Sequence, residues 1–167
     1  MKENITGKQY ITTMCFGCGK DNHTGLHGRF YNLESGKIAA LFQPGDLFQS
    51  YPQRLHGGIT AAILDETLGR CILAPEPDCW AVTAELTVRY KKPVPLNVPL
   101  KIIAEITDNN RRLFRSSGTL ILPDGEVAAT ATGIYMKQAL TQIADTEGVD
   151  LQKIRIDQDS EFEYFEY

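Results

Sequence analysis

The sequence predicts an α+β domain in which a long antiparallel β-sheet wraps around one central helix. Three observations support this fold class: a single long apolar helical stretch at 57–73, a strictly alternating stretch at 80–91, and three more strand-like stretches between 100 and 136. The chain has 167 residues, a length typical of one domain with one hydrophobic core.

A β-hairpin is expected before the helix. Residues 26–33 and 37–43 are rich in apolar and aromatic side chains and flank a turn that contains Gly36. A loop rich in Pro, Gly and Gln follows at 44–55. The helix should end before the proline-containing segment 75–78, because proline cannot continue a helix.

The helix is apolar almost all the way round, which predicts burial on most of its sides. The residues that give it this character are Ile59, Ala61, Ala62, Ile63, Leu64 and Leu68. The last predicted strand offers small residues that would let the helix lie close to the sheet: Ala128, Ala129, Ala131 and Gly133.

Four antiparallel strands are expected after the helix. In 80–91 the alternation places Leu86 on an apolar face and Thr83 on the polar face. The other strands are expected at about 100–107, 112–122 and 126–136, and an Asp-Gly turn joins the last two. We predict one domain at 1–137 with an N-terminal lead-in, and a weakly helical, acidic extension at 138–167.

The composition restricts the function classes. The formal net charge is −4, which argues against general nucleic-acid binding because such proteins carry a basic stripe. There is neither an apolar run of membrane-spanning length nor an N-terminal signal-peptide core. We therefore expect a cytoplasmic protein that associates with neither membranes nor nucleic acids, and whose four cysteines stay reduced.

Cys15 and Cys18 form a C-x-x-C motif, with His23 and His27 close behind it. A zinc finger separates its Cys and His pairs by about a dozen residues, and a thioredoxin-like redox pair needs a βαβ context, so neither pattern fits. We interpret the motif as a glycine-rich turn before the first strand. The sequence thus predicts no metal and no cofactor.

Residues 54–66, RLHGGITAAILDE, combine a glycine-rich helix start with a carboxylate further along. A helix N-terminus presents unpaired N–H groups, and glycine lets a ligand oxygen approach them closely. The N–H of Gly58, together with that of Gly57, could therefore stabilise a developing oxyanion. Asp65 lies about 10 Å further along the same helix, too far to act on the same carbonyl.

The sequence resembles the hotdog-fold acyl-CoA thioesterases, in particular the PaaI-type (phenylacetate-pathway) branch. The resemblance extends from about Cys15 to Lys137, and its strongest part is the HGG motif with Asp65 nine residues after His56. Further similar segments are CFGCGKDNHTGL at 15–26, FQSYPQRLHGG at 48–58 and ELTVRYKKPV at 85–94.

The resemblance implies hydrolysis of an acyl-CoA thioester to a free acid and CoA. Asp65 would be the nucleophile or the general base, and the family spacing selects it over its neighbour Glu66. The family places its sites at a subunit interface, so the separation of Gly58 from Asp65 implies a homodimer or a dimer of dimers.

Other residues are weaker candidates for substrate contacts. We expect His56 to orient the helix start rather than to transfer protons. The loop residues Gln49, Ser50 and Gln53 stand where relatives can carry an asparagine. Thr83 stands where a relative can hold the attacking water, but the strand alternation predicts that it faces solvent. Arg111 and Arg112 lie in a basic turn suited to CoA phosphates.

Two other function classes remain open on the same fold. One is an acyl-CoA sensor that binds without turnover, and the other is a dehydratase with a His–acid pair in a different arrangement. Asp65 and the double glycine favour the thioesterase. The sequence leaves the acyl group open, because the subunits together form the walls of the pocket.

Overall fold

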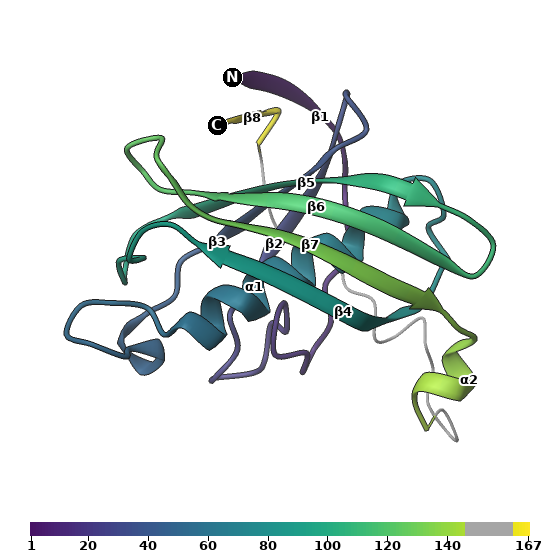
Figure 1. Cartoon of the computed structure of the whole chain (residues 1–167), viewed down its shortest axis with the longest axis horizontal. Coiled ribbons are helices and arrows are strands. Elements are labelled where there is room, and N and C mark those ends of the chain that lie inside the picture. The colour runs from purple at the N-terminus through teal and green to yellow at the C-terminus, as the bar shows by residue number, and fades with distance from the viewer. Residues whose placement is uncertain (146–161) are drawn as a thin grey trace.

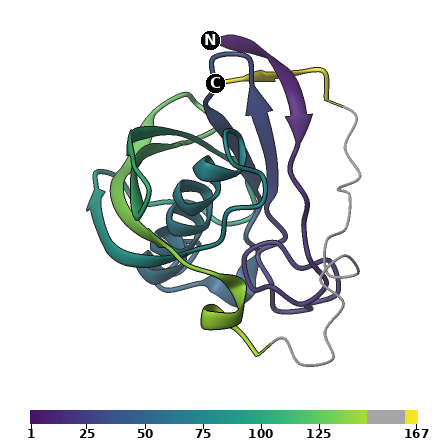
Figure 2. The same cartoon turned by 90° about the vertical axis from the view of Figure 1, so that its right-hand side faces the viewer.

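A strongly curved antiparallel sheet surrounds one long helix, as predicted. The computed structural model describes residues 1–145 and 162–167. Figure 1 shows the sheet across the front of the molecule with α1 behind it, and Figure 2 shows the sheet curling around that helix. The two chain ends lie side by side, since the strands that carry them are paired.

The central helix α1 spans Gly57–Gly69 and continues into a 3-10 turn, η2, at Arg70–Leu73. A second 3-10 turn, η1, spans Asp46–Phe48, and a one-turn helix, α2, spans Leu140–Ile143. The strands of the described residues are β1 (Lys2–Lys8), β2 (Arg29–Leu33), β3 (Ile38–Phe42), β4 (Ala81–Tyr90), β5 (Leu100–Asn109), β6 (Leu113–Ile121), β7 (Val127–Lys137) and β8 (Tyr164–Glu166).

Eight strands form one sheet in the order β4-β7-β6-β5-β3-β2-β1-β8, and every pairing is antiparallel. The strands on either side of the helix therefore agree with the sequence-based expectation. The two terminal strands were not predicted. β1 extends the sheet beyond β2, and β8 pairs with β1, where Phe165 is buried against Tyr31.

The helix packs on the concave face of the sheet. Its side chains Ile63, Leu64 and Leu68 are completely buried, whereas Ile59 near the helix start is only partly buried. Gly118 in β6 permits this close packing, because a Cβ there would lie 2.5 Å from a methyl group of Leu68. The helix axis is therefore fixed against the middle of the sheet.

β4 is an edge strand, and its outer backbone edge has no neighbour among the described strands. A β-bulge interrupts its pairing with β7: Thr83 pairs with Tyr135 and Glu85 with Ile134, so Ala84 is the extra residue. Leu86 and Val88 remain partly exposed and Tyr90 is 53% exposed, although they belong to the face that the alternation predicts to be buried.

The extension at 138–167 is described only in part. The weakly helical stretch corresponds to α2, and the acidic-aromatic end forms β8. The expectation for residues 146–161 lies outside the described residues. No helix in the described part of the chain combines the length and the apolar character that crossing a membrane requires.

Candidate active site

The Asp65 carboxylate is held by two hydroxyl groups from the sheet. Thr83 Oγ1 donates to both carboxylate oxygens, at 3.0 Å to Oδ1 and 3.1 Å to Oδ2. Tyr135 donates from its hydroxyl to Oδ1 at 3.0 Å and to the Asp65 backbone carbonyl at 3.2 Å. The carboxylate is therefore oriented from both sides, with Oδ2 less occupied than Oδ1.

Thr83 is exposed at the sheet edge, as expected, but it does not lie on the polar face where the alternation placed it. Strict alternation would place it on the polar face, opposite Leu86. The bulge at Ala84 adds one residue to the strand, so that Thr83 turns toward the helix. Because its partner Tyr135 is a buried residue of the helix-facing side, Thr83 reaches Asp65 from the same side.

Tyr135 is a functional candidate that the sequence analysis missed. It is 2% exposed and stacks on Phe114, with ring centroids 4.9 Å apart. The signal that could have identified it is the spacing of the small residues Ala129, Ala131 and Gly133, which alternate along the helix-facing side of β7 and place residue 135 on that same side.

The electrostatic environment of Asp65 is set mainly by burial, which raises the pKa of its carboxyl group. The hydrogen bonds from Thr83 and Tyr135 act in the opposite direction, and the negative charge of Glu66 raises the pKa further. The net result is a pKa above the usual aspartate value. Burial and the neighbouring Asp65 charge also raise the pKa of Tyr135, so that it remains a hydrogen-bond donor.

Glu66 points into a different environment from its neighbour Asp65. It forms an ion pair with Arg70 (Oε1 to Nε, 2.8 Å) and lies beside the C-x-x-C motif. Arg70 Nη2 lies 3.0 Å from Cys18 Sγ. Hydrogen bonding from Cys15, aided by the charge of Arg70, lowers the pKa of Cys18 to about 6. The structure thus places the two carboxylates in different environments.

A cavity of about 290 Å³ lies next to both groups. Asp65, Thr83 and Tyr135 line one part of it, and Cys15, Cys18 and Glu66 line another. The Asp65 carboxylate is therefore accessible to a small molecule while most of its residue is shielded from bulk water.

At the other end of the helix, His56 is the N-cap residue of α1 and its Nδ1 accepts from the N–H of Gly58 at 3.0 Å. The sequence analysis expected the Gly58 N–H to face a ligand, whereas in this structure the donor is engaged by the His56 side chain. The N–H of Gly57 has no backbone acceptor among the described residues. The Tyr90 hydroxyl donates to the Gly57 carbonyl at 2.8 Å and ties the helix start to the end of β4.

The predicted loop residues lie beside this helix start, and no hydrogen bond joins them to Asp65 in the described structure. Gln49 accepts from the backbone N–H of Gln53 at 2.9 Å, and Ser50 Oγ lies 3.4 Å from the Arg54 carbonyl. Gln53 has a positive φ of 60° and is exposed.

Arg111 and Arg112 are exposed in the turn between β5 and β6. The Arg112 carbonyl accepts from Lys137, which pairs with Ala81 at the start of β4. The two arginines therefore lie at the Thr83 end of β4 and not at the Gly57 end.

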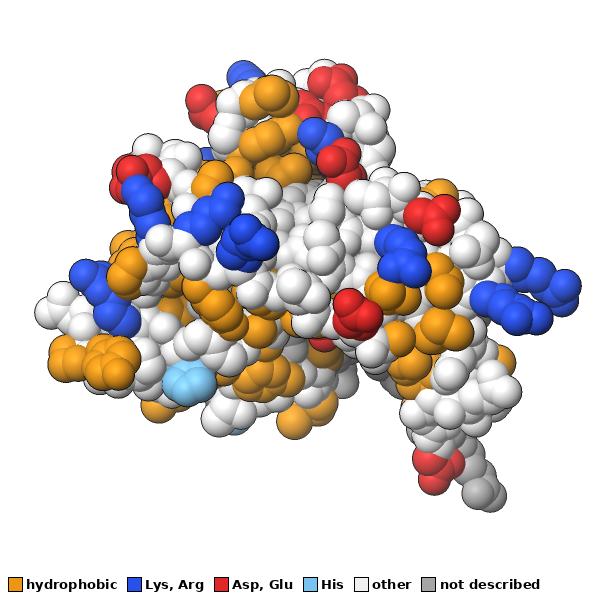
Figure 3. All heavy atoms as spheres, viewed as in Figure 1, with side chains coloured by type: hydrophobic (Ala, Val, Ile, Leu, Met, Phe, Trp, Pro, Cys, Tyr) orange, Lys and Arg blue, Asp and Glu red, His pale blue; other side chains and the backbone are white. Residues whose placement is uncertain are grey.

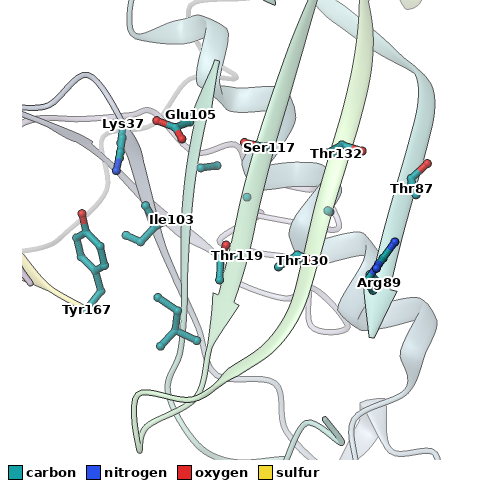
Figure 4. Close-up of a pocket in the computed structure, with 14 residues that line it drawn as sticks. Lys37, Thr87, Arg89, Ile103, Glu105, Ser117, Thr119, Thr130, Thr132 and Tyr167 are labelled. Carbon is teal, nitrogen blue, oxygen red and sulfur yellow. The ribbon is translucent and has the colours of Figure 1, made fainter. Parts of the chain in front are cut away.

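A second hollow, of about 540 Å³, lies on the outer face of the sheet, away from α1. Hydroxyl groups from three neighbouring strands line it, including Thr119 and Thr130, with Arg89 and Glu105 near its edges (Figure 4). Figure 3 shows that the middle of this face is mostly uncharged, with Lys and Arg side chains toward its two ends. Asp65 and His56 do not line this hollow.

A long antiparallel sheet wrapped around a central helix is the hotdog fold, and a half-buried carboxylate lies beside the edge of this sheet. Residues 53–129 match the family model described as the Thioesterase superfamily. Residues 53–129 therefore belong to this superfamily.

Curated relatives include the acyl-coenzyme A thioesterase THEM4 of Mus musculus, 31% identical over 112 residues, which covers 66% of this chain and 47% of that protein. THEM4 of Xenopus laevis is 33% identical over 110 residues, covering 65% of this chain and 48% of that protein. The chain thus spans about half the length of these relatives.

Solved structures support the same fold. Protein RHA08564, described as a thioesterase superfamily protein, has a TM-score of 0.64 and 26% identity, covering 71% of this chain and 57% of that one. The BH2602 protein from Bacillus halodurans, solved with CoA, has a TM-score of 0.56 and 30% identity, covering 60% of this chain and 66% of that one. The E. coli PaaI protein has a TM-score of 0.62 at 13% identity, with coverages of 68% and 81%, and shares the fold.

Proposed function

We propose that this protein hydrolyses acyl-CoA thioesters and that Asp65 is its catalytic carboxylate. The observation that carries the proposal is the placement of Asp65 at a cavity wall, oriented by Thr83 and Tyr135 and with Oδ2 the less occupied oxygen. The relatives named as acyl-CoA thioesterases and the related structure solved with CoA support the substrate class.

Asp65 would act on the thioester in one of two ways. As a general base it takes a proton from water, whose oxygen then attacks the thioester carbonyl. As a nucleophile it attacks the carbonyl itself and forms an anhydride, which water then hydrolyses. In both routes the C–S bond breaks and the CoA thiolate leaves. Thr83 holds the carboxylate in either route.

The oxyanion of the intermediate needs a donor, and we assign this role to the N–H of Gly57. His56 would be a positioning residue, because it fixes the first turn of the helix through Gly58. Gly57 and Asp65 are about 12 Å apart along the helix axis, which is too far for both to act on one carbonyl. The complete site therefore requires two subunits.

The edge strand β4 supports such a dimer. It spans ten residues, about 30 Å, with Thr83 near its beginning and Tyr90 at its end. If two copies of β4 pair antiparallel, the end of one strand lies beside the beginning of the other. The Gly57 that Tyr90 anchors would then approach the Asp65 of the other subunit. Pairing would also cover the partly exposed Leu86 and Val88 and the exposed Tyr90.

The dimer would also bring the remaining predicted residues to the site. Ser50 and Gln53, beside the helix start, would approach the Asp65 of the other subunit. Arg111 and Arg112 lie at the Thr83 end, where they can contact CoA phosphates. The acyl specificity, PaaI-type or other, would depend on walls contributed by both subunits. The four cysteines are free, in keeping with a cytoplasmic setting.

The test is a hydrolysis screen over aromatic, medium-chain and branched acyl-CoAs, in which released CoA thiol is measured and Asp65→Ala serves as the inactive control. We expect hydrolysis of at least one class and none by the variant. If the wild-type protein binds acyl-CoA but hydrolyses no substrate in the panel, the sensor function replaces this proposal.

A further inference from the structure

The C-x-x-C motif does not stand alone in the folded chain. Cys15, Cys18 and Glu66 offer donor atoms that all lie within 4.8 Å of one another. Cys15 and Cys18 come from the loop before β2, whereas Glu66 comes from the third turn of α1. We propose that these three residues form a binding site for a thiophilic divalent cation, with Zn²⁺ as the expected ion.

The donor set fits this ion. Zinc in proteins prefers thiolate, imidazole and carboxylate ligands in tetrahedral geometry, and C-x-x-C is a common way to supply two of them. Donor atoms in such a site lie about 3.5–3.8 Å apart, which requires little movement from the observed cluster. Three protein ligands leave the fourth position to water from the adjoining cavity.

The charges of the cluster also favour a cation. A divalent ion displaces the thiol protons when it binds, so two thiolates and the Glu66 carboxylate would then balance its charge. The guanidinium of Arg70 lies beside these donors. Arg70 bonds both Glu66 and Cys18, and its contacts are of the kind that orient metal ligands from outside.

The loop that carries the cysteines is built to hold both thiols in place. The N–H of Gly19 donates to the Cys15 carbonyl at 2.7 Å, which closes the turn between the two cysteines. The backbone N–H groups of Leu26 and Gly28 bond the carbonyls of Phe16 and Gly17 and fasten the loop to the segment before β2.

Gly17 lets this loop reach the helix. A Cβ at this position would lie 2.7 Å from the Glu66 carboxyl group, so a larger residue would displace this carboxyl group from its observed position. The site would therefore clamp the loop at 15–19 to α1, one residue away from Asp65. The spacing of the motif could not predict this location, because Glu66 is distant in sequence. The proposal departs from the sequence-based expectation that the cysteines bind no metal.

The first experiment measures the metal content of the protein as purified, by elemental analysis. We expect about one zinc per chain. After chelation, titration with Co²⁺ should produce a thiolate-to-cobalt charge-transfer absorption, and Zn²⁺ should remove it. Neither readout depends on catalytic activity, so the result is independent of the proposed function.

Variants then locate the site. Cys18→Ser should lose stoichiometric zinc and the charge-transfer absorption, and Glu66→Gln should weaken Zn²⁺ binding at least about tenfold. The matched control is Cys79→Ser, because Cys79 lines the same cavity outside the donor cluster. It should retain the metal. Circular dichroism checks that each variant is folded.

Three outcomes would overturn the proposal. One is wild-type protein that neither contains zinc nor binds Co²⁺ after reduction. Another is a Cys15–Cys18 disulfide that, once reduced, still binds no metal. The third is Cys79→Ser losing the metal to the same extent as Cys18→Ser.

Discussion

The two ends of the helical segment from His56 to Asp65 are built in opposite ways. At its start, His56, Gly57 and Gly58 are exposed, and the N–H of Gly57 has no backbone acceptor among the described residues. Two turns later, Asp65 is half-buried and its carboxylate accepts from two sheet hydroxyls. One end offers a donor without a partner, and the other offers an oriented acceptor.

Under the proposed function, neither end completes a site within one chain. The fold of its own chain stabilises the exposed helix start only weakly, because the two glycines have no side chains to pack and have low helix propensity. Asp65 has lost much of its hydration to burial, and within residues 1–145 and 162–167 only Thr83 and Tyr135 donate hydrogen bonds to its carboxylate. A second subunit that unites the two ends would explain both features. The following predictions test this comparison, from the largest expected effect to the smallest.

Asp65→Asn should lower kcat at least about a hundredfold, because it removes the charge that acts as base or nucleophile. The amide has nearly the same shape, so KM should remain within a few-fold of the wild-type value. Steady-state hydrolysis of the best substrate checks this. Asp124→Asn in the β6–β7 turn is the control, and a similar loss there would contradict the specific role of Asp65.

Gly57→Pro should lower kcat by about a hundredfold, because it removes the N–H assigned to the oxyanion. Proline is tolerated at the first helical position, and His56 already has φ −62° and ψ 135°, which suits a residue before proline. Gly57→Ala keeps the N–H, and its Cβ would be 3.7 Å from Tyr90, an ordinary contact. Alanine should therefore be close to wild type.

A mixture of Asp65→Asn chains and Gly57→Pro chains tests the two-subunit site directly. A heterodimer of one Asp65→Asn chain and one Gly57→Pro chain contains one intact site and one doubly damaged site. Random association should restore about a quarter of the wild-type activity, because half the dimers are mixed and each has one site of two. Absence of recovery, with mixed dimers confirmed by differential tagging, would contradict a shared site.

Thr83→Val should lower kcat about tenfold, a smaller loss than Asp65→Asn. It removes a hydrogen bond to a charged acceptor while keeping the size and β-branching of the side chain. Thr87→Val is the matched control in the same strand, since Thr87 lies on the outer face. In the double variant with Asp65→Asn, the effect of Thr83→Val should largely disappear.

His56→Ala should reduce the free energy of unfolding by about 1 kcal/mol, because the helix loses its N-cap acceptor. His56→Asn should recover most of this stability, since asparagine is a strong N-cap residue. Denaturant unfolding measures both. Equal stability of the alanine and wild-type proteins would show that the Gly58 contact does not stabilise the helix.

The sequence was informative wherever a local pattern sufficed. The apolar run at 57–73 and the alternation after it predict the helix and the strands that surround it, and the HGG spacing selects Asp65. The pairing of β1 with β8 could not be predicted, because it joins opposite ends of the chain. The contact of Glu66 with the C-x-x-C loop could not be predicted either, because these residues are also distant in sequence.

The individual roles within the site were harder to predict than its location. The sequence analysis favoured the Gly58 N–H as the donor, but the choice between two neighbouring N–H groups depends on which one the His56 side chain accepts from, and that is Gly58. Thr83 was placed on the wrong face because periodicity assumes an uninterrupted strand. Such local geometry is set by packing and hydrogen bonding that a spacing rule does not contain.

The extra residue Ala84 in β4 determines which face of the sheet the preceding side chains of the strand point to. Residues 85–90 keep their orientation whatever happens at position 84, but those before it are reversed as a group when one residue is gained or lost. A lineage could therefore disconnect Thr83 from the Asp65 carboxylate by deleting Ala84, with every residue of the site still present in the alignment. Counting residues between Asp65 and the threonine is thus a more informative comparison among relatives than checking whether the threonine is conserved.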